Sequence, residues 1–145
     1  MQMKMKVFVD PGANIPTRAH PNDAGLDLYA RNDGWILPKS RKTFGTGFHA
    51  LIEPGFVGML TSKSGMMAKQ GITSRGTIDS GYTGEIRAVL FNHSWLPVKI
   101  KAGQKITQLV IMPIETPELD FCDFFDFYWE STERGSDGFG STGKF

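Results

Sequence analysis

A carboxylate and a phenol lie close together in a glycine-rich stretch, residues 76–86. Asp79 and Tyr82 flank Ser80 and Gly81, a pair that favours a tight turn because glycine readily adopts positive φ. β-Branched residues on either side suit strands, so we predict a β-hairpin folded at this pair. Its glycines would let a ligand approach the backbone, and Asp79 and Tyr82 could line a small-molecule pocket. The alternative is that Asp79 only caps the turn and Tyr82 is an ordinary strand residue.

Two further stretches carry groups that suit a phosphate. Lys63 precedes Ser64 and Gly65, where we predict a short helix with Ser64 as its N-cap and Gly71 as its end. The free amides and the dipole at such a helix start favour an anion. Gln108 lies within an apolar strand, where its amide could bond a phosphate oxygen. The alternatives are a capped surface helix and a core amide with protein partners.

The last fifteen residues, 131–145, are rich in glycine and have little to bury, so we predict a mobile tail. Glycine amides and hydroxyls can bind phosphates, and an aromatic side chain can stack on a base. The tail residues that could bind a nucleotide in this way are Arg134, Phe139, Gly140, Ser141 and Thr142. The alternative is a disordered linker, although linkers seldom keep an arginine and a phenylalanine.

Composition limits the class of protein. The chain has 145 residues, 40% of them apolar, which suits one domain, and its 17 glycines and 8 prolines favour many short strands. Cys122 is the single cysteine, so an internal disulfide is excluded and a reducing compartment fits. A net charge of +1 does not indicate binding to nucleic acid or to an anionic membrane. With no targeting segment or membrane span in the sequence, we expect a cytoplasmic protein.

The elements that must position these groups follow from alternating apolar residues. We predict strands over 4–9, 23–30, 35–37, 42–48, 49–52, 56–60, 86–91, 98–101 and 106–112, and one helix over 64–70. Asp27 is held on the second strand. The aromatic and acidic run 121–129 is predicted to be a further strand and a subunit contact. The spacing indicates an all-β barrel or sandwich over residues 1–130, followed by the tail.

Taken together, these segments resemble the trimeric dUTPases, the deoxyuridine triphosphate nucleotidohydrolases. Five stretches that match the family occur in the family's order and span most of the chain: 24–30, 62–66, 76–86, 103–110 and 134–143. The glycine-rich end of the last stretch is especially specific. The resemblance implies a jelly-roll-like β-barrel that forms a homotrimer. Each of its three active sites would take residues from all three subunits, and each tail would close over a neighbour's substrate.

The resemblance also implies a reaction, the hydrolysis of dUTP to dUMP and pyrophosphate with Mg²⁺. This reaction keeps uracil out of DNA and supplies dUMP for thymidylate synthesis. Asp79 would be the general base that deprotonates a water for attack on the α-phosphorus. Tyr82 would exclude a ribose 2′-hydroxyl, and backbone groups such as those of Ile78 would pair with uracil. Asp27 would act on the ion through a metal-bound water, because the triphosphate itself holds the Mg²⁺.

Further residues are implied to contact the nucleotide, and two positions depart from the family. Phe139 would stack on uracil. The residues implied to bind the phosphates are Lys63, Ser64, Gly65, Gln108, Arg134, Gly140, Ser141 and Thr142. Lys63 stands where the family usually has arginine, and a point charge cannot reproduce the bidentate fork of a guanidinium. Asp137 stands where glycine is frequent and adds a negative charge near the triphosphate.

Three other functions compete with this one. A sister family with the same barrel deaminates dCTP, but it needs a glutamate where this chain has Val89, and an aliphatic side chain cannot move protons. A dUTP-binding regulator would act through protein contacts, with hydrolysis secondary. A plain interaction or carbohydrate-binding jelly roll would use the aromatic run 121–129 as its contact surface.

Overall fold

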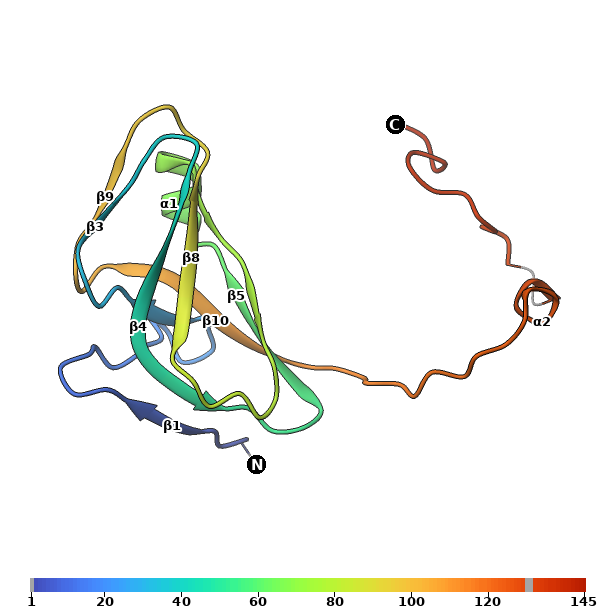
Figure 1. Cartoon of the computed structure of the whole chain (residues 1–145), viewed down its shortest axis with the longest axis horizontal. Coiled ribbons are helices and arrows are strands. Elements are labelled where there is room, and N and C mark those ends of the chain that lie inside the picture. The colour runs from blue at the N-terminus through green and yellow to red at the C-terminus, as the bar shows by residue number, and fades with distance from the viewer. Residues whose placement is uncertain (1, 130–131) are drawn as a thin grey trace. The chain divides into compact units, whose positions relative to one another are not determined.

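The structure is a computed structural model that describes residues 2–129 and 132–145 (Figure 1). Contacts divide the chain into two units, Met1–Glu115 and Thr116–Phe145. The second unit contains helix α2 (Phe124–Trp129). The elements of the first unit are β1 (Lys6–Val9), β2 (Leu26–Tyr29), β3 (Gly34–Ile36), β4 (Arg41–Leu51), β5 (Phe56–Thr61), α1 (Ser64–Gln70), β6 (Ile72–Ser74), β7 (Gly76–Ile78), β8 (Ile86–Asn92), β9 (Val98–Ile100) and β10 (Lys105–Pro113).

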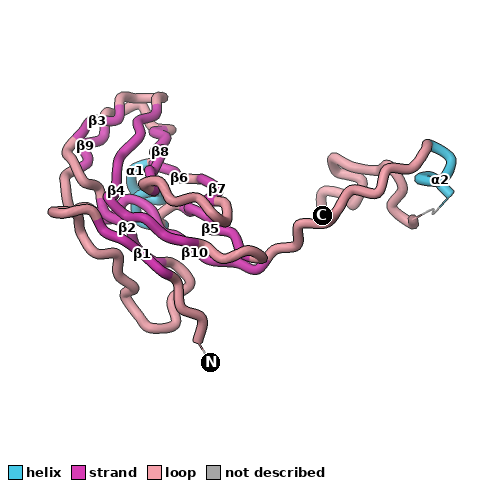
Figure 2. Tube along the Cα trace, turned by 60° about the horizontal axis from the view of Figure 1, so that its bottom comes forward, coloured by secondary structure: helices cyan, strands magenta, loops and turns pink. Residues whose placement is uncertain are grey.

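The strands of the first unit form two four-stranded antiparallel sheets and a two-stranded ribbon (Figure 2). One sheet has the order β1-β4-β8-β6, the other has the order β2-β10-β5-β7, and β3 pairs with β9. Two buried apolar clusters each take side chains from both sheets, as packed layers require. The predicted all-β, jelly-roll-like fold is confirmed.

Strand β4 pairs with two strands, β8 and β1, and contains a β-bulge. Its first part pairs with β8 and its last part pairs with β1, with a register shift between Gly45 and Phe48. Inside the bulge, the hydroxyl of Thr46 donates to the carbonyl of Ile86 at 2.6 Å. Gly47 has φ of 68°, and a Cβ there would lie 2.4 Å from the side chain of the nearby Ala13. We predicted two separate strands here, over 42–48 and 49–52, whereas the bulge keeps them one strand.

The predicted hairpin over 76–86 is wrong. β7 pairs with β5, whereas β8 pairs with β4 and β6, so the loop between them connects the two sheets. The alternating residues indicate strands correctly, but they do not specify which strand each one pairs with. β6, at Ile72–Ser74, was also missed.

The helix predicted over 64–70 is confirmed as α1, although its N-cap differs, and the prediction for 121–129 is wrong. The N-cap of α1 is Lys63 rather than Ser64, and it makes no side-chain capping bond. Gly71 ends the helix in the left-handed conformation, as predicted, with φ of 67°. The run 121–129 is not a strand, because residues 124–129 form α2. Asp123 accepts a hydrogen bond from the backbone amide of Asp126 at 2.8 Å, which stabilises the helix start.

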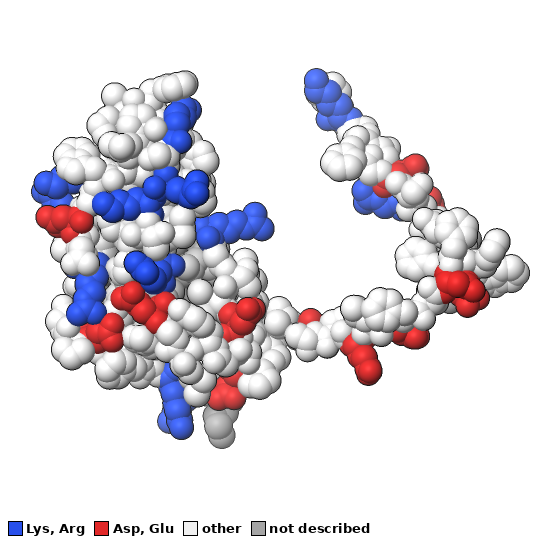
Figure 3. Space-filling model, viewed as in Figure 1, with Lys and Arg blue, Asp and Glu red and all other residues white. Residues whose placement is uncertain are grey.

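The second unit is almost entirely exposed, including the aromatic side chains of α2 and Cys122. Acidic side chains recur along it (Figure 3). Among residues 2–129 and 132–145, the structure has no helix long and apolar enough to cross a membrane.

Candidate active site

The loop between β7 and β8 surrounds a small pocket. Asp79 follows directly after β7 and is exposed to solvent. The backbone carbonyl of Asp79 accepts a bond from the amide of Tyr82 at 3.2 Å, and Gly81 has φ of 81°, so the chain turns sharply here. The pocket has a volume of about 280 Å³ and is lined by Thr77, Ile78, Asp79, Tyr82, Glu85 and Arg87. Three predicted site residues, Ile78, Asp79 and Tyr82, are therefore brought together.

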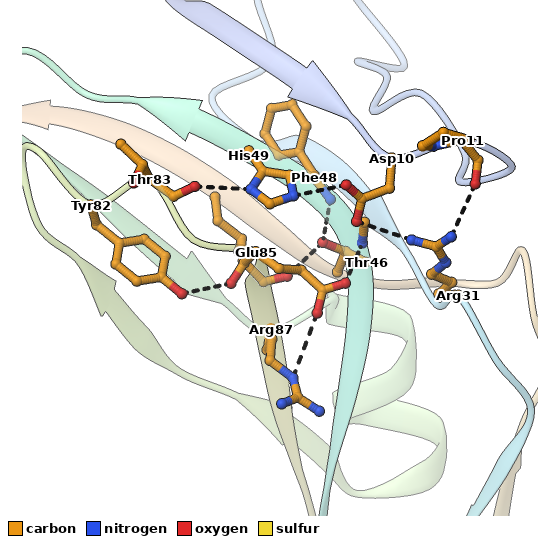
Figure 4. A network of polar contacts seen from close by, with 12 residues as sticks. Asp10, Pro11, Arg31, Thr46, Phe48, His49, Tyr82, Thr83, Glu85 and Arg87 are labelled. Atoms are coloured by element: carbon orange, nitrogen blue, oxygen red, sulfur yellow. Dashed lines mark hydrogen bonds and ion pairs between the residues drawn. The ribbon is translucent and has the colours of Figure 1, made fainter.

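Tyr82 is held by its own loop (Figure 4). Its hydroxyl donates to the carbonyl oxygen of Glu85 at 2.8 Å. The ring folds back over Gly84, where a Cβ would lie only 2.4 Å from the phenol oxygen. The side chain of Glu85 accepts a bond from the backbone amide of Gly47 at 3.0 Å and lies 3.7 Å from Arg87. Gly84 thus leaves the space in which the ring lies against the loop.

A histidine on β4 also contacts this loop. In His49, Nδ1 lies 3.0 Å from the carbonyl oxygen of Thr83, and Nε2 lies 3.0 Å from Oδ1 of Asp10 (Figure 4). The other carboxylate oxygen of Asp10 accepts a bond from Arg31 at 3.0 Å. The bond to Thr83 and the charges of Asp10 and Glu85 raise the pKa of His49, against the opposing effect of burial. Sequence reasoning missed these residues because they are distant along the chain.

A second group of predicted residues surrounds Asp27 on β2. Its carboxylate is buried, with 4% of the residue exposed. Oδ1 accepts a hydrogen bond from Lys63, and Oδ2 lies 3.2 Å from the ammonium of Lys105. Burial raises the pKa of Asp27, but the bonds and charges of the two lysines outweigh it, and the pKa lies below its usual value. Lys105 was not predicted, and only its pairing with β2 places it here.

Gln108 lies beside this carboxylate, on β10. It is paired with Asp27 on one side and with Thr61 on the other. Its amide nitrogen donates to the carbonyl oxygen of Ser62 at 3.0 Å. Its side chain covers Gly25, where a Cβ would lie 2.1 Å from the amide oxygen. The amide is half-buried and has a protein partner, and it adjoins the Asp27–Lys63 pair.

Lys63 leads directly into α1, whose first two residues are Ser64 and Gly65. Both are exposed, and a Cβ on Gly65 would meet nothing within 4 Å. An incoming ligand would therefore have access to the backbone here. Gln108 pairs with Asp27 and with Thr61, the last residue of β5, and Lys63, Ser64 and Gly65 follow that strand.

The two groups lie at opposite ends of β5. Ile78 lies opposite Gly58 near the start of β5, and Asp79, the next residue, lies toward that end. Lys63 follows two residues after Thr61, the last residue of β5. Gly58 and Thr61 are about 10 Å apart, at ~3.3 Å per residue, which gives the scale of the separation between the two groups. The structure therefore brings the predicted residues of the first unit together in two separate groups.

The predicted tail residues belong to the second unit. Arg134 donates through Nε to the carbonyl oxygen of Asp137 at 2.8 Å. Two turns follow, closed by bonds from Ser141 to Gly138 at 3.2 Å and from Gly143 to Gly140 at 3.0 Å. All residues of 132–145 are exposed, including Phe139 and Thr142. Their roles at the site, and the division of the chain at residue 130, stay predictions.

The residues near Asp27 fit a hydrated ion rather than a fully protein-bound one. Among the described residues, no three His, Cys, Asp or Glu side chains are grouped so that they could hold a metal. Each carboxylate oxygen of Asp27 faces one lysine and has a further lone pair. That lone pair can accept a bond from a water molecule of a hydrated Mg²⁺, which usually keeps several waters.

Comparison with known proteins identifies one family. The sequence profile of the dUTPase family matches residues 12–143. The deoxyuridine 5′-triphosphate nucleotidohydrolase of Nocardia farcinica is 39% identical over 139 residues, which cover 93% of this chain and 82% of that protein. A dUTPase variant of Staphylococcus bacteriophage 80alpha, solved with dUpNHpp, has a TM-score of 0.89 and 28% identity, and the match covers 99% of this chain and 100% of that one.

A second solved structure extends the comparison. A dUTPase variant of phage phi11 of S. aureus, in which the coordination of a structural Mg(II) ion was studied, has a TM-score of 0.79 and 28% identity. The match covers 86% of this chain and 100% of that one. Fold and pocket together define a jelly-roll-like β protein with a pocket beside the β7–β8 loop. The chain belongs to the dUTPase family, and the predicted enzyme class, dUTP diphosphatase, is confirmed.

Proposed function

We propose that this chain hydrolyses dUTP to dUMP and pyrophosphate, with Asp79 as the general base. The carboxylate is exposed, and it lies on the wall of the 280 Å³ pocket. It takes a proton from a water molecule, and the water oxygen forms a bond to the α-phosphorus. The bond from that phosphorus to the α–β bridging oxygen breaks, and pyrophosphate leaves with the bonding electrons. Asp79 later releases its proton to solvent.

The pocket supports selection for a deoxyribose and for uracil. The ring of Tyr82 lies over Gly84, bonds Glu85 through its hydroxyl, and would occupy the space that a ribose 2′-hydroxyl needs. The backbone of Ile78 lies at the end of β7 and would pair with the edge of uracil. The expected substrate is therefore dUTP, with dTTP, dCTP and UTP turned over poorly.

The separation of the two groups along β5 is the observation that carries the proposed assembly. Asp79 lies near the start of that strand, and the residues expected to bind the triphosphate lie at or beyond its end in the same chain. A nucleotide bound to Asp79 is therefore expected to meet Lys63, Ser64, Gly65 and Gln108 of another copy. A closed ring of three copies would complete three such sites, and Arg134, Phe139, Gly140, Ser141 and Thr142 would cover them.

Magnesium would be held near Asp27 through water. The ion, when bound, neutralises charge on the triphosphate and aligns the α-phosphate for displacement. Asp27 accepts hydrogen bonds from Lys63 and Lys105, which keeps it ionised. Lys63 would also lie beside the phosphates, where it supplies a point charge rather than an arginine fork.

A mixing experiment tests the assembly. Asp79→Asn chains and Lys63→Ala/Gln108→Ala chains are purified, shown to be impaired alone, and refolded together at equal ratio. If each site combines two chains, random trimers contain intact sites, and turnover returns to about a quarter of the wild-type rate. The matched control mixes each variant with itself. No recovery in verified mixed trimers would show that each site is built from a single chain.

A substrate panel tests the reaction itself. Pyrophosphate release is measured with dUTP, dTTP, dCTP and UTP in the presence of Mg²⁺. We expect turnover of dUTP alone, and equal turnover of UTP would contradict the role of Tyr82. The regulatory alternative has no support over hydrolysis, and binding of dUTP without any release of pyrophosphate would revive it.

A further inference from the structure

We propose that His49, as an imidazolium, is a positioning residue that fastens the substrate loop 79–85 to the β4–β1 edge. This inference rests on the proposed function of that loop. His49 touches neither the pocket wall nor the reacting atoms that Asp79 and Tyr82 face. It acts through Thr83, the residue that follows Tyr82.

The geometry specifies the protonation state. Both ring nitrogens of His49 lie 3.0 Å from oxygens that can only accept hydrogen bonds, the carbonyl of Thr83 and the carboxylate of Asp10. A neutral imidazole carries one N–H, so one of its nitrogens would direct a lone pair at one of these oxygens. Only the doubly protonated ring satisfies both. The raised pKa of His49 agrees with this assignment.

The charged groups around the ring favour the cation. Asp10, just after β1, and Glu85, just before β8, both present carboxylates to it. Two cations oppose this stabilisation of the imidazolium. Arg31 bonds the second carboxylate oxygen of Asp10, and Lys6 lines the same surface pocket as His49. The ring of Phe8 lies at 5.5 Å and covers one side of the imidazole. His49 has 24% of its side chain exposed, so water screens these charges only in part.

His49 holds only one end of the loop 79–85, the end next to β8. β7 fixes the Asp79 end by its pairing with β5. At the other end, Glu85 bonds to the backbone of Gly47 and His49 bonds to Thr83. Loss of the second bond would loosen the segment that carries Tyr82 more than the base at Asp79. Substrate binding should therefore suffer more than the chemical step.

The sign of the pH dependence follows from the raised pKa. The contribution of His49 is fully present below the ordinary histidine value, about 6.5, and is lost as pH rises through the raised value in the folded protein. As pH rises from about 6.5 through the raised pKa of His49, we expect KM for dUTP to rise about tenfold, which is the effect of losing one hydrogen bond to a charged group. The change in kcat should be smaller.

The test compares full-length chains with matched histidine variants. KM and kcat are measured across this interval for wild type, His49→Gln and His93→Gln. His93 is an exposed histidine whose ring bonds Thr73, away from the loop. We expect the rise in wild type and His93→Gln, and a flat, elevated KM in His49→Gln. The same rise in His49→Gln would overturn the proposal.

A second measurement does not depend on turnover. The ring of His49 is titrated by NMR in the wild type and in Asp10→Asn, together with the backbone amides of Tyr82, Thr83 and Gly84. We expect a midpoint above the ordinary histidine value, lower in Asp10→Asn, with the loop amides following it. A midpoint at or below that value would refute the fastening. Absent dUTP turnover at every pH would instead contradict the proposed function and leave the titration to decide.

Discussion

Replacing Gly84 by alanine should separate substrate selection from stability. The residue does not have positive φ, so alanine suits its backbone, but the new Cβ would lie 2.4 Å from the hydroxyl oxygen of Tyr82 and 2.6 Å from the ring carbon that bears it. Ordinary contact begins near 3.4 Å, so the end of the ring must move by about 1 Å. Tyr82 is 45% exposed, and the ring can swing outward without displacing the core.

The cost in stability is small. The bond from Tyr82 to Glu85 is lost, at about 1 kcal/mol, and water can replace it at this exposed position. For a domain of this size, such a loss lowers Tm by roughly 3 °C. A shift of about 1 Å at a substrate-positioning group can cost up to about 100-fold in rate, so we expect the preference for dUTP over UTP to fall at least tenfold.

The assay measures kcat/KM for dUTP and UTP with Gly84→Ala, alongside thermal unfolding. Tyr82→Phe is the control, because it removes the same hydrogen bond but leaves the ring in place. It should show a similar change in Tm and keep most of the preference. An unchanged preference in Gly84→Ala, with the ring shown to have moved, would refute the role given to Tyr82.

Three further predictions concern other parts of the molecule. Asp79→Asn should bind dUTP with roughly unchanged affinity, measured by calorimetry, and lose most turnover, since only the water loses its base; retained turnover would contradict that role. A chain ending at Glu133 should lose turnover while its Tm stays within about 2 °C, because residues 134–145 are exposed; a melted β domain would contradict a separable tail. Asp27→Asn should destabilise the fold by about 1 kcal/mol at neutral pH, since it removes the charge partner of Lys63 and Lys105, whose side chains are 27% and 44% exposed and remain partly solvated. The pKa of Asp27 is lowered in the folded protein, so its stabilisation is present above the unfolded pKa and is lost as pH falls through the folded pKa. The free energy of unfolding of Asp27→Asn, measured in urea, should therefore approach the wild-type value in acid. The exposed Asp120→Asn is the control.

The β strands were predictable wherever one face is buried. In β8 the buried residues Ile86, Ala88 and Leu90 alternate with more exposed ones, and that pattern is visible in the sequence. The pairing of 76–78 with β5 was not visible, because local alternation does not specify a partner strand. The helix at 124–129 was missed because aromatic residues favour strands, while the capping bond from Asp123 acts against that preference.

The candidate site was predictable in its residue types but not in its contacts. Asp79 and Tyr82 are close in sequence, so their shared pocket followed from local spacing. Asp27 and Lys105 meet only because β2 pairs with β10, and His49 meets Asp10 only because β4 pairs with β1. Such partners depend on strand order, which a single sequence specifies poorly.

The placement of Asp79 and Lys63 toward opposite ends of β5 has a consequence for a cell that makes two versions of this chain. In the proposed ring, every copy contributes a base to one active centre and phosphate ligands to the next. A copy that lacks both Asp79 and the phosphate ligands would therefore disable its neighbour's centre as well as its own. Co-production of such an allele at equal amounts should behave as dominant negative, because about a quarter of the centres, rather than half, would be intact.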